Sequence, residues 1–559
     1  MVELRSNFKP GSTEWAVRRA QWRAMGIEEG DFEKPKVAVV YSSSQLSVCY
    51  SHLDELSDLV SQELRGAGVL PFEIRTVAPS DFVTSAGRSA RYLMPSRDLL
   101  VNDVEVAVEG ALLDGMICLA SCDKTTPGQL MAAARLNLPT TIAIGGYQEA
   151  GKCGETLRDI DDVYEAVGTV AAGRMSIAEL AEMADNAIDG PGVCAGLGTA
   201  NSMHILAEAL GMTVKGSAPI RAGSPEMQLR AKEAARCLVD MINAGTRPRD
   251  ILTAEAIENA VIVAIAVGAS VNTARHLQAV AVEAELEVDV YKLIEQHAQH
   301  VPMISTVRPN GSHRIEELAR AGGALTVMKH LETLLHTDAL TVGGLTLGER
   351  LADVDLDLTD VIRTLDSVRG TAPGLALFRG SLAPLGAVVK TGALPGGVHY
   401  IRGPAKVFER EEDAIDAIRD RRIVPGDVAV LRGLGVKGGP GTAFAAGFVA
   451  ALNGAGLGST VACVTDGELS GLNRGITIGQ IMPEAAEGGP LALVAEGDEI
   501  EIDVSGRVVN LLVDDDVIAR RQRDWVPPDP PTERSWLTFY WLLVDSLSRG
   551  GALRTFRET

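Results

Sequence analysis

The chain has 559 residues, too many for one hydrophobic core, so we expect two or more structural units. Hydrophobic residues make up 46% and charged residues 23%, as in an ordinary globular protein, and the formal net charge is −22. This charge disfavours non-specific binding to nucleic acids or anionic membranes, because long-range repulsion opposes each encounter.

Short apolar runs alternate with amphipathic patterns over the first half of the chain. A strand is predicted from Lys36, a helix from His52, a strand at Met116–Ala120, a helix that opens at Pro127 and a further strand from Thr140. Strands that alternate with helices indicate βαβ units, in which a parallel sheet carries helices on its faces.

A helix-rich stretch is predicted from about Ser176 to Leu335, and the composition changes near Val368–Gly374. Beyond this change come short, glycine-rich strand patterns without a clear parallel run. We therefore predict an α/β fold with an N-terminal parallel-sheet domain over 1–370 and a C-terminal β-rich, barrel-like domain over 371–559.

The sequence has no run of about 18 apolar residues and no signal-peptide pattern at its N-terminus, which predicts a cytoplasmic protein without a membrane partner. The cysteines are then thiols or metal ligands rather than disulfides. They are Cys49, Cys118, Cys122, Cys153, Cys194, Cys237 and Cys463.

Cys49, Cys122 and Cys194 each lie shortly before a predicted helix. Amide groups at a helix N-terminus favour thiolate over thiol, and thiolates bind iron. The alternative for any one of them is a small buried hydrophobic residue, which Cys118 and Cys237 fit well. No CxxC pair occurs, so the spacing alone does not predict a metal site.

The segment SCDKTTPGQLM places a thiol, a carboxylate and an amine on successive residues at the carboxyl end of a predicted strand. Open α/β sheets bind ligands at that end. Asp123 can supply an oxygen to a hard cation, whereas Lys124 could do so only as a carbamate, because an ammonium has no free lone pair. The alternative is a surface ion pair beside the start of a helix.

Long motifs along nearly the whole chain resemble the iron–sulfur-dependent dihydroxy-acid and sugar-acid (aldonate) dehydratases. They are CDKTTPGQLMA from Cys122, CAGLGTANSMHILAEALG from Cys194, GSLAPLGAVVKTGAL from Gly380, GPAKVFEREEDAIDAI from Gly403, VKGGPG from Val436 and TDGELSGLNRGITIGQIMPEAAEGGPLALV from Thr465. The resemblance implies a hydro-lyase that converts a 2,3-dihydroxy carboxylic acid into a 2-keto acid and water.

The same resemblance implies that Cys122 and Cys194 ligate an iron–sulfur cluster. A third cysteine before a His-Leu pair marks [2Fe–2S] members, and Cys49 in CYSHL fits that position. Ser470 matches the catalytic serine of the family, whose alkoxide would remove the C2 proton.

For the magnesium ion of the family, the resemblance implies Asp81, Asp123 and a carbamylated Lys124 as ligands. A glutamate usually follows the GGPG motif, but Phe444 stands there in this chain. The family commonly has arginine in TDGRFSG, whereas this chain has Glu468 in TDGELSG. We hypothesise that Glu468 compensates for the lost acid.

Other interpretations stay open at this point. A GxGxxG pattern at Gly433–Gly438, with Asp466 further on, is a weak signal for a dinucleotide-binding protein. Phe444 leaves room for a non-catalytic relative. Within the enzymes, branched short dihydroxy acids of amino-acid biosynthesis compete with sugar acids as substrate, and the family suggests a homodimer or homotetramer.

Overall fold

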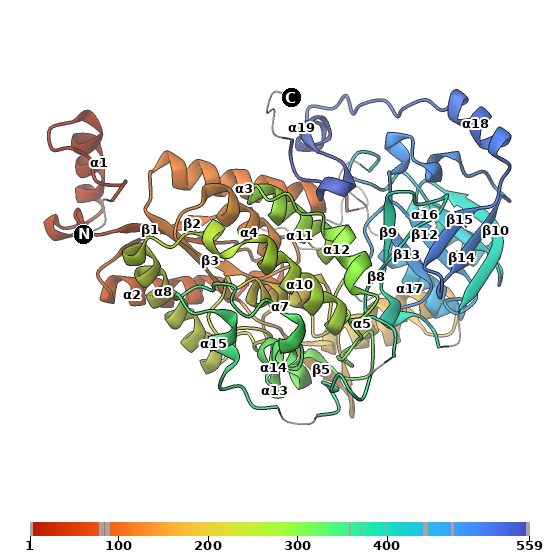
Figure 1. Ribbon diagram of the computed structural model, residues 1–559, viewed down its shortest axis with the longest axis horizontal. Coiled ribbons are helices and arrows are strands. Elements are labelled where there is room, and N and C mark those ends of the chain that lie inside the picture. Colours follow the sequence, from red (N-terminus) through yellow and green to blue (C-terminus); the bar gives the residue numbers. More distant parts are fainter. Residues whose placement is uncertain are drawn as a thin grey trace.

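The computed structural model describes residues 4–77, 83, 90–356, 359–368, 370–396, 399–439, 445–470 and 474–554. Asp81 and Phe444, which the sequence analysis singled out, lie outside the described residues. Figure 1 shows the first half of the chain, coloured red to green, beside the second half, coloured cyan to blue. The small helix α1 (Thr13–Ala24) stands at the far end of the first half.

A four-stranded parallel sheet forms the centre of the first half, with the order β2-β1-β3-β4. Every residue of β1, β3 and β4 is buried, as expected for continuous apolar runs that need cover on both faces. The strands are β1 (Lys36–Tyr41), β2 (Leu70–Arg75), β3 (Gly115–Ala120) and β4 (Thr140–Ile144). The parallel sheet predicted from the sequence is confirmed.

Paired helices cover the two faces of this sheet. One pair is α2 (Leu53–Gly66) and α8 (Pro225–Ala244), and the other is α3 (Leu93–Gly110) and α4 (Thr125–Leu136). Helix α4 begins two residues before Pro127, so the predicted start at Pro127 is wrong. Proline is tolerated inside the first helical turn because the amides of that turn have no intrahelical acceptor.

The predicted helix-rich stretch is confirmed, and its central helices are almost wholly buried. Besides α8, it contains α6 (Ile177–Asn186), α7 (Thr199–Ala209), α9 (Pro248–Ile251), α10 (Ala254–Val267), α11 (Asn272–Glu283), α12 (Val290–His297), α13 (Ile315–Arg320) and α14 (Gly323–His330). Helix α5 (Ile160–Ala171) precedes the stretch, and α15 (Leu347–Leu351) follows it. A small antiparallel sheet precedes and interrupts it, formed by β5 (Glu149–Cys153), β6 (Thr156–Arg158) and β7 (Ile188–Asp189).

An eight-stranded sheet forms the second half, with the order β15-β14-β10-β11-β12-β13-β9-β8. An isolated bridge between Arg379 and Val508 joins its two edges, so the sheet is nearly closed, and the predicted barrel-like fold is confirmed. The strands are β8 (Ala376–Phe378), β9 (Gly386–Val389), β10 (Tyr400–Phe408), β11 (Val428–Leu431), β12 (Ala462–Thr465), β13 (Thr477–Met482), β14 (Glu499–Asp503) and β15 (Val508–Leu511).

The four central strands of this sheet, β10 to β13, are parallel, contrary to the sequence interpretation. Two crossover helices, α16 (Glu411–Arg419) and α17 (Ala446–Ala455), connect the first three of them. A helical crossover returns the chain to the starting edge and so makes the next strand parallel.

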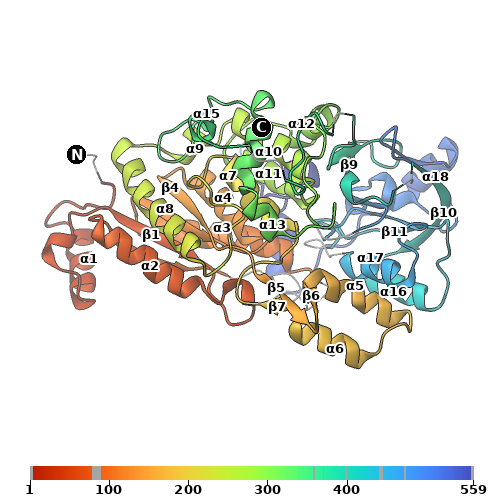
Figure 2. The same ribbon diagram turned by 90° about the horizontal axis from the view of Figure 1, so that it is seen from below.

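Helix α5 of the first half packs against α17 of the second, and Figure 2 shows the two helices side by side. Glycines allow their close approach, since a Cβ on Gly168 would lie 2.2 Å from the carbonyl oxygen of Ala450.

After the eight-stranded sheet, the chain continues through α18 (Asp515–Asp524) and α19 (Trp536–Leu543) to the short turn η7 (Leu547–Arg549), which packs on α11. Within the described ranges, no helix combines the length and the apolar character needed to cross a bilayer.

Candidate active site

The loops that carry Cys49, Cys122 and Cys194 are joined directly by hydrogen bonds. Ser121 Oγ donates to the carbonyl of Cys49 at 2.5 Å, and the amide of Gly192 donates to the carbonyl of Val48 at 3.3 Å. The Cys49 loop follows β1, the Cys122 loop follows β3, and the Cys194 loop precedes α7. Segments that are distant in sequence therefore meet at the carboxyl edge of the parallel sheet, where such sheets bind ligands.

Each of the three cysteines precedes a helix, as the sequence predicted. Cys49 lies in the short turn η2 (Val48–Tyr50) before α2, Cys122 lies before α4, and Cys194 lies before α7. Cys49 and Cys122 are buried, and Cys194 is partly exposed. Asn201 in the first turn of α7 donates to the carbonyl of Cys194 at 2.7 Å and so fixes that loop.

Three other cysteines fit a structural role. Cys118 in β3, Cys237 in α8 and Cys463 in β12 are buried, and burial raises the pKa of all three thiols, that of Cys237 to about 11. They are therefore protonated at neutral pH and are poor metal ligands. Cys153 lies partly exposed in β5.

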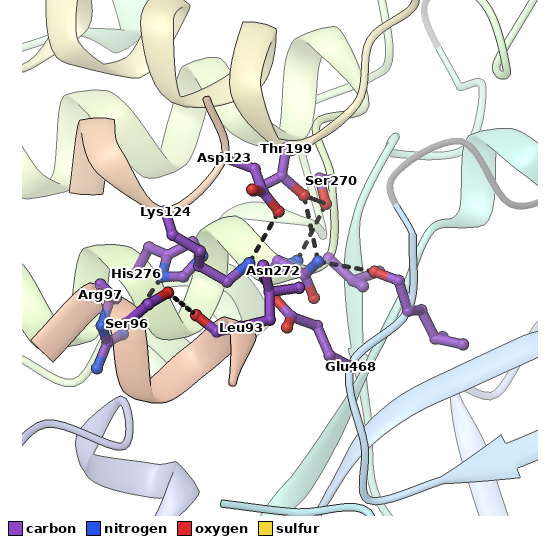
Figure 3. Close-up of polar contacts among 12 residues, drawn as sticks. Leu93, Ser96, Arg97, Asp123, Lys124, Thr199, Ser270, Asn272, His276 and Glu468 are labelled. Carbon is purple, nitrogen blue, oxygen red and sulfur yellow. Dashed lines mark hydrogen bonds and ion pairs between the residues drawn. The ribbon is translucent and has the colours of Figure 1, made fainter. Parts of the chain in front are cut away.

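Lys124 stands at the centre of a buried charged cluster (Figure 3). Its Nζ lies 2.9 Å from Asp123 Oδ2 and 2.8 Å from Glu468 Oε1. The side chains of Lys124 and Glu468 are both 0% exposed, so the alternative of a surface ion pair is wrong. Burial alone would lower the pKa of Lys124, but the charges and hydrogen bonds of Asp123 and Glu468 outweigh it and raise that pKa.

The cluster leaves one carboxylate oxygen without a hydrogen-bond partner. Glu468 Oε2 is buried and unpaired, while Oε1 accepts from Lys124. An unpaired buried carboxylate oxygen is costly, and a hard cation would satisfy it. Asp123 and Glu468 thus offer the oxygen ligands that magnesium prefers. Within the described part of the chain, there is no group of three or more histidine, cysteine, aspartate or glutamate side chains that is arranged to hold a metal ion.

Ser470 follows Glu468 by two residues, and helix α11 fixes the chain between them. Asn272 Nδ2 donates to the carbonyl of Leu469 at 2.7 Å and to Thr199 Oγ1 at 3.2 Å (Figure 3). Ser470 also lines a small cavity together with Asp161 and other residues of α5 and α17. The backbone of the predicted serine is therefore held by the first half of the chain.

Two neighbours of the cluster were missed by the sequence analysis. Asn272 and His276 lie four residues apart on α11, a spacing that places both side chains on one helix face. His204 was also missed; its Nε2–H donates to the carbonyl of Ser121 at 2.6 Å and so supports the loop that leads to Cys122. The i, i+4 spacing of Asn272 and His276 was the signal that could have pointed to α11.

The glycine-rich loop uses its backbone amides internally. The amides of Gly433 and Leu434 donate to Asp466 at 3.2 and 2.9 Å, and the amide of Lys437 donates to Glu484 Oε1 at 2.8 Å. A loop that cradles a dinucleotide needs such amides for the phosphates. The geometry therefore contradicts the dinucleotide-binding interpretation.

Comparisons with known proteins agree on one family. Residues 34–350 match the family described as dihydroxy-acid/6-phosphogluconate dehydratase N-terminal, and residues 360–551 match its C-terminal counterpart. A dihydroxy-acid dehydratase of Ignicoccus hospitalis is 40% identical over 543 residues, which cover 97% of this chain and 98% of that protein. A dihydroxy-acid dehydratase of Syntrophobacter fumaroxidans is 39% identical over 557 residues, 99% of this chain and 100% of that protein.

Proposed function

The chain belongs to the dihydroxy-acid/6-phosphogluconate dehydratase family, and from that premise we propose that it removes water from a 2,3-dihydroxy carboxylic acid to form a 2-keto acid. Both relatives, which match over nearly their whole length, carry the name dihydroxy-acid dehydratase. The observation that carries the proposal is the buried cluster of Asp123, Lys124 and Glu468 beside the three cysteine loops. Such costly buried charge is typical of functional sites.

We further propose that Cys49, Cys122 and Cys194 hold a [2Fe–2S] cluster, and that Asp81, Asp123 and Lys124 as a carbamate hold magnesium. The hydrogen-bonded cysteine loops and the unpaired oxygen of the charged cluster support this assignment. When bound, these metal groups would polarise the leaving 3-hydroxyl and the carboxylate and 2-hydroxyl oxygens of the substrate.

Ser470 is the proposed base. Its Oγ, as an alkoxide, takes the proton from C2, and the C3–O bond breaks with loss of hydroxide. The enol then takes up a proton at C3 and loses the proton of its 2-hydroxyl, which gives the 2-keto acid. Asn272 keeps the backbone before Ser470 in place, which fixes the distance over which the proton moves. Because Glu468 lies on the same turn, the charged cluster and the base are positioned together.

The substrate that we favour is a branched short dihydroxy acid, on the route to branched-chain amino acids, since both relatives are named dihydroxy-acid dehydratases. A sugar acid is the second candidate within the family. We also propose a cytoplasmic homodimer or homotetramer, as the family resemblance implies.

The test is a substrate panel with protein that is purified without oxygen and supplied with Mg²⁺. We expect 2-keto acid from 2,3-dihydroxy-3-methylbutanoate and little from gluconate. Ser470→Ala should lower turnover by about 10²- to 10⁴-fold, the usual contribution of a general base. Ser505→Ala, in the exposed turn between β14 and β15, is the matched control. Keto acid from no member of the panel would contradict the proposal and favour a non-catalytic relative.

A further inference from the structure

The geometry points to Glu468 as a direct ligand of the divalent cation, with its free carboxylate oxygen supplying the bond. This inference rests on the proposed function, because it concerns the cation of the same site. The inference goes beyond the proposed function because it assigns a cation ligand from the second half of the chain, in the segment that also carries Ser470.

The backbone on both sides of Glu468 is fixed, so its carboxylate has a defined position. The carbonyl of Glu468 accepts from the amide of Ala445 at 3.1 Å, and the amide of Gly467 donates to Thr465 Oγ1 at 2.9 Å. On the other side, Asn272 holds the carbonyl of Leu469. A ligand held by its own backbone contacts is preorganised for a cation.

The two oxygens of Glu468 have different surroundings. Oε1 lies 2.8 Å from Lys124 Nζ, whereas Oε2 has no partner although the side chain is 0% exposed. Oε2 is therefore a buried acceptor without a donor, next to the contact between Lys124 and Asp123. A magnesium ion, which prefers oxygen ligands, matches the chemistry of that atom.

Glu484 provides a contrast within the same half of the molecule. Its Oε2 is also buried without a partner. However, burial raises the pKa of Glu484 to about 8, so that side chain is protonated at neutral pH and carries no unmatched charge. Its Oε1 accepts from the backbone amides of Lys437 and Gly438 and not from a lysine side chain. An unpaired oxygen alone is thus not the argument. Glu468 differs from Glu484 because it meets Asp123 at Lys124, so two carboxylates lie close together beside the unpaired oxygen.

The charge of the cluster also favours a divalent cation. Asp123 and Glu468 against Lys124 leave one net negative charge. Carbamylation of Lys124 consumes one CO₂, releases two protons from the ammonium, and leaves three negative groups around the site. The carbamate keeps a single N–H but loses the positive charge, so the ion pair with Oε1 would be lost and both oxygens of Glu468 would become available for the cation.

The test is Mn²⁺ binding to full-length protein that is purified without oxygen and freed of divalent ions. Free Mn²⁺ is measured by electron paramagnetic resonance, and the waters on bound Mn²⁺ are counted by water-proton relaxation. Glu468→Gln should weaken binding by about tenfold or more and add one bound water, because water replaces the lost ligand. Glu484→Gln is the matched control and should bind as the unaltered protein does.

Glu468→Asp is the second variant, since it keeps the charge beside Lys124 and withdraws the oxygens by one methylene. The same loss of affinity and gain of water is expected for it. Unchanged affinity in both variants, or weaker binding without an additional water, would overturn the assignment. Keto-acid formation is assayed separately on the unaltered protein, so the proposed function can fail while the Mn²⁺ result still decides the role of Glu468.

Discussion

Two buried ion pairs near His276 differ in how completely their hydrogen-bonding groups are satisfied. One joins Arg97 to Asp98, and the other joins Lys124 to Glu468. In both pairs the side chains are almost wholly excluded from solvent. Burial of a charge is expensive in either case, so the difference in pairing indicates which pair serves the fold and which serves chemistry.

The guanidinium of Arg97 has a partner for every donor. Its Nε and Nη2 donate to Asp98 at 3.1 to 3.2 Å, its Nη1 donates to the carbonyl of Gly550 at 3.1 Å and to His276 Nδ1 at 3.3 Å, and its Nη2 also donates to the carbonyl of Gly551 at 2.8 Å. This arrangement ties α3 to the end of the chain. A fully satisfied pair of this kind is structural.

The Lys124 pair leaves the acceptor Oε2 of Glu468 unused. His276 contacts Arg97 through its Nδ1. Burial, together with the nearby charges of Lys124 and Arg97, holds the pKa of His276 well below its usual range. The histidine is therefore neutral and accepts from Arg97 rather than adding a third positive charge. The incomplete pair of Lys124 and Glu468 is thus the one that we propose to serve the reaction.

The largest expected effect comes from Asp123→Asn, which removes a proposed cation ligand while Lys124 keeps Glu468. Turnover should fall by about 10³-fold or more, because a bound metal supplies several kcal/mol of transition-state stabilisation. The urea midpoint should hardly change. Initial rates and urea unfolding measure the two effects. Turnover within tenfold of that of the unaltered protein would contradict the proposed role of Asp123 as a cation ligand.

Arg97→Met tests the opposite pair. Removing one partner of a buried ion pair leaves Asp98 uncompensated and should lower the free energy of unfolding by about 3–5 kcal/mol. Urea unfolding measures this loss. Arg402→Met is the control, because Arg402 pairs with Glu499 on the exposed surface, and it should leave the midpoint unchanged. Equal stability of the two variants would show that the Arg97 pair is not structural.

A smaller effect is expected from the support of the cysteine loop. Burial lowers the pKa of His204 to about 4, from an ordinary value near 6.5 in the unfolded chain. Below pH 6.5, His204 binds a proton in the unfolded chain but stays neutral in the folded protein. The free energy of unfolding therefore falls as the pH drops from about 6.5 to 4, by at most about 3 kcal/mol. The slope of the unfolding free energy against pH should be shallower in His204→Gln and unchanged in the exposed control His300→Gln.

The sequence predicted those structural features that depend on residues close together in the chain. The buried apolar runs of β1, β3 and β4, the helices α2 and α4, and the placement of Cys49, Cys122 and Cys194 before helices follow from periodicity and turn residues. The parallel pairing of β10 to β13 could not be predicted in this way, because it depends on helical crossovers that are hard to recognise in the glycine-rich sequence.

The charged cluster shows the same division. Asp123 and Lys124 are neighbours in sequence, and their position after β3 was predictable. Glu468 is 344 residues from Lys124, and no pattern gives the 2.8 Å contact between them. The hypothesis that Glu468 acts near the site came from the family motif, whereas its unpaired oxygen became visible only in the folded chain.

The central claim is that three cysteine loops and a buried charged cluster form one metal-bearing centre, and the most direct test is iron and acid-labile sulfide in protein prepared without oxygen. We predict about two irons and two sulfides per chain, a marked loss in Cys122→Ser, and no change in the control Cys153→Ser. Protein without iron and sulfide, or a Cys122→Ser variant with full content, would contradict the claim.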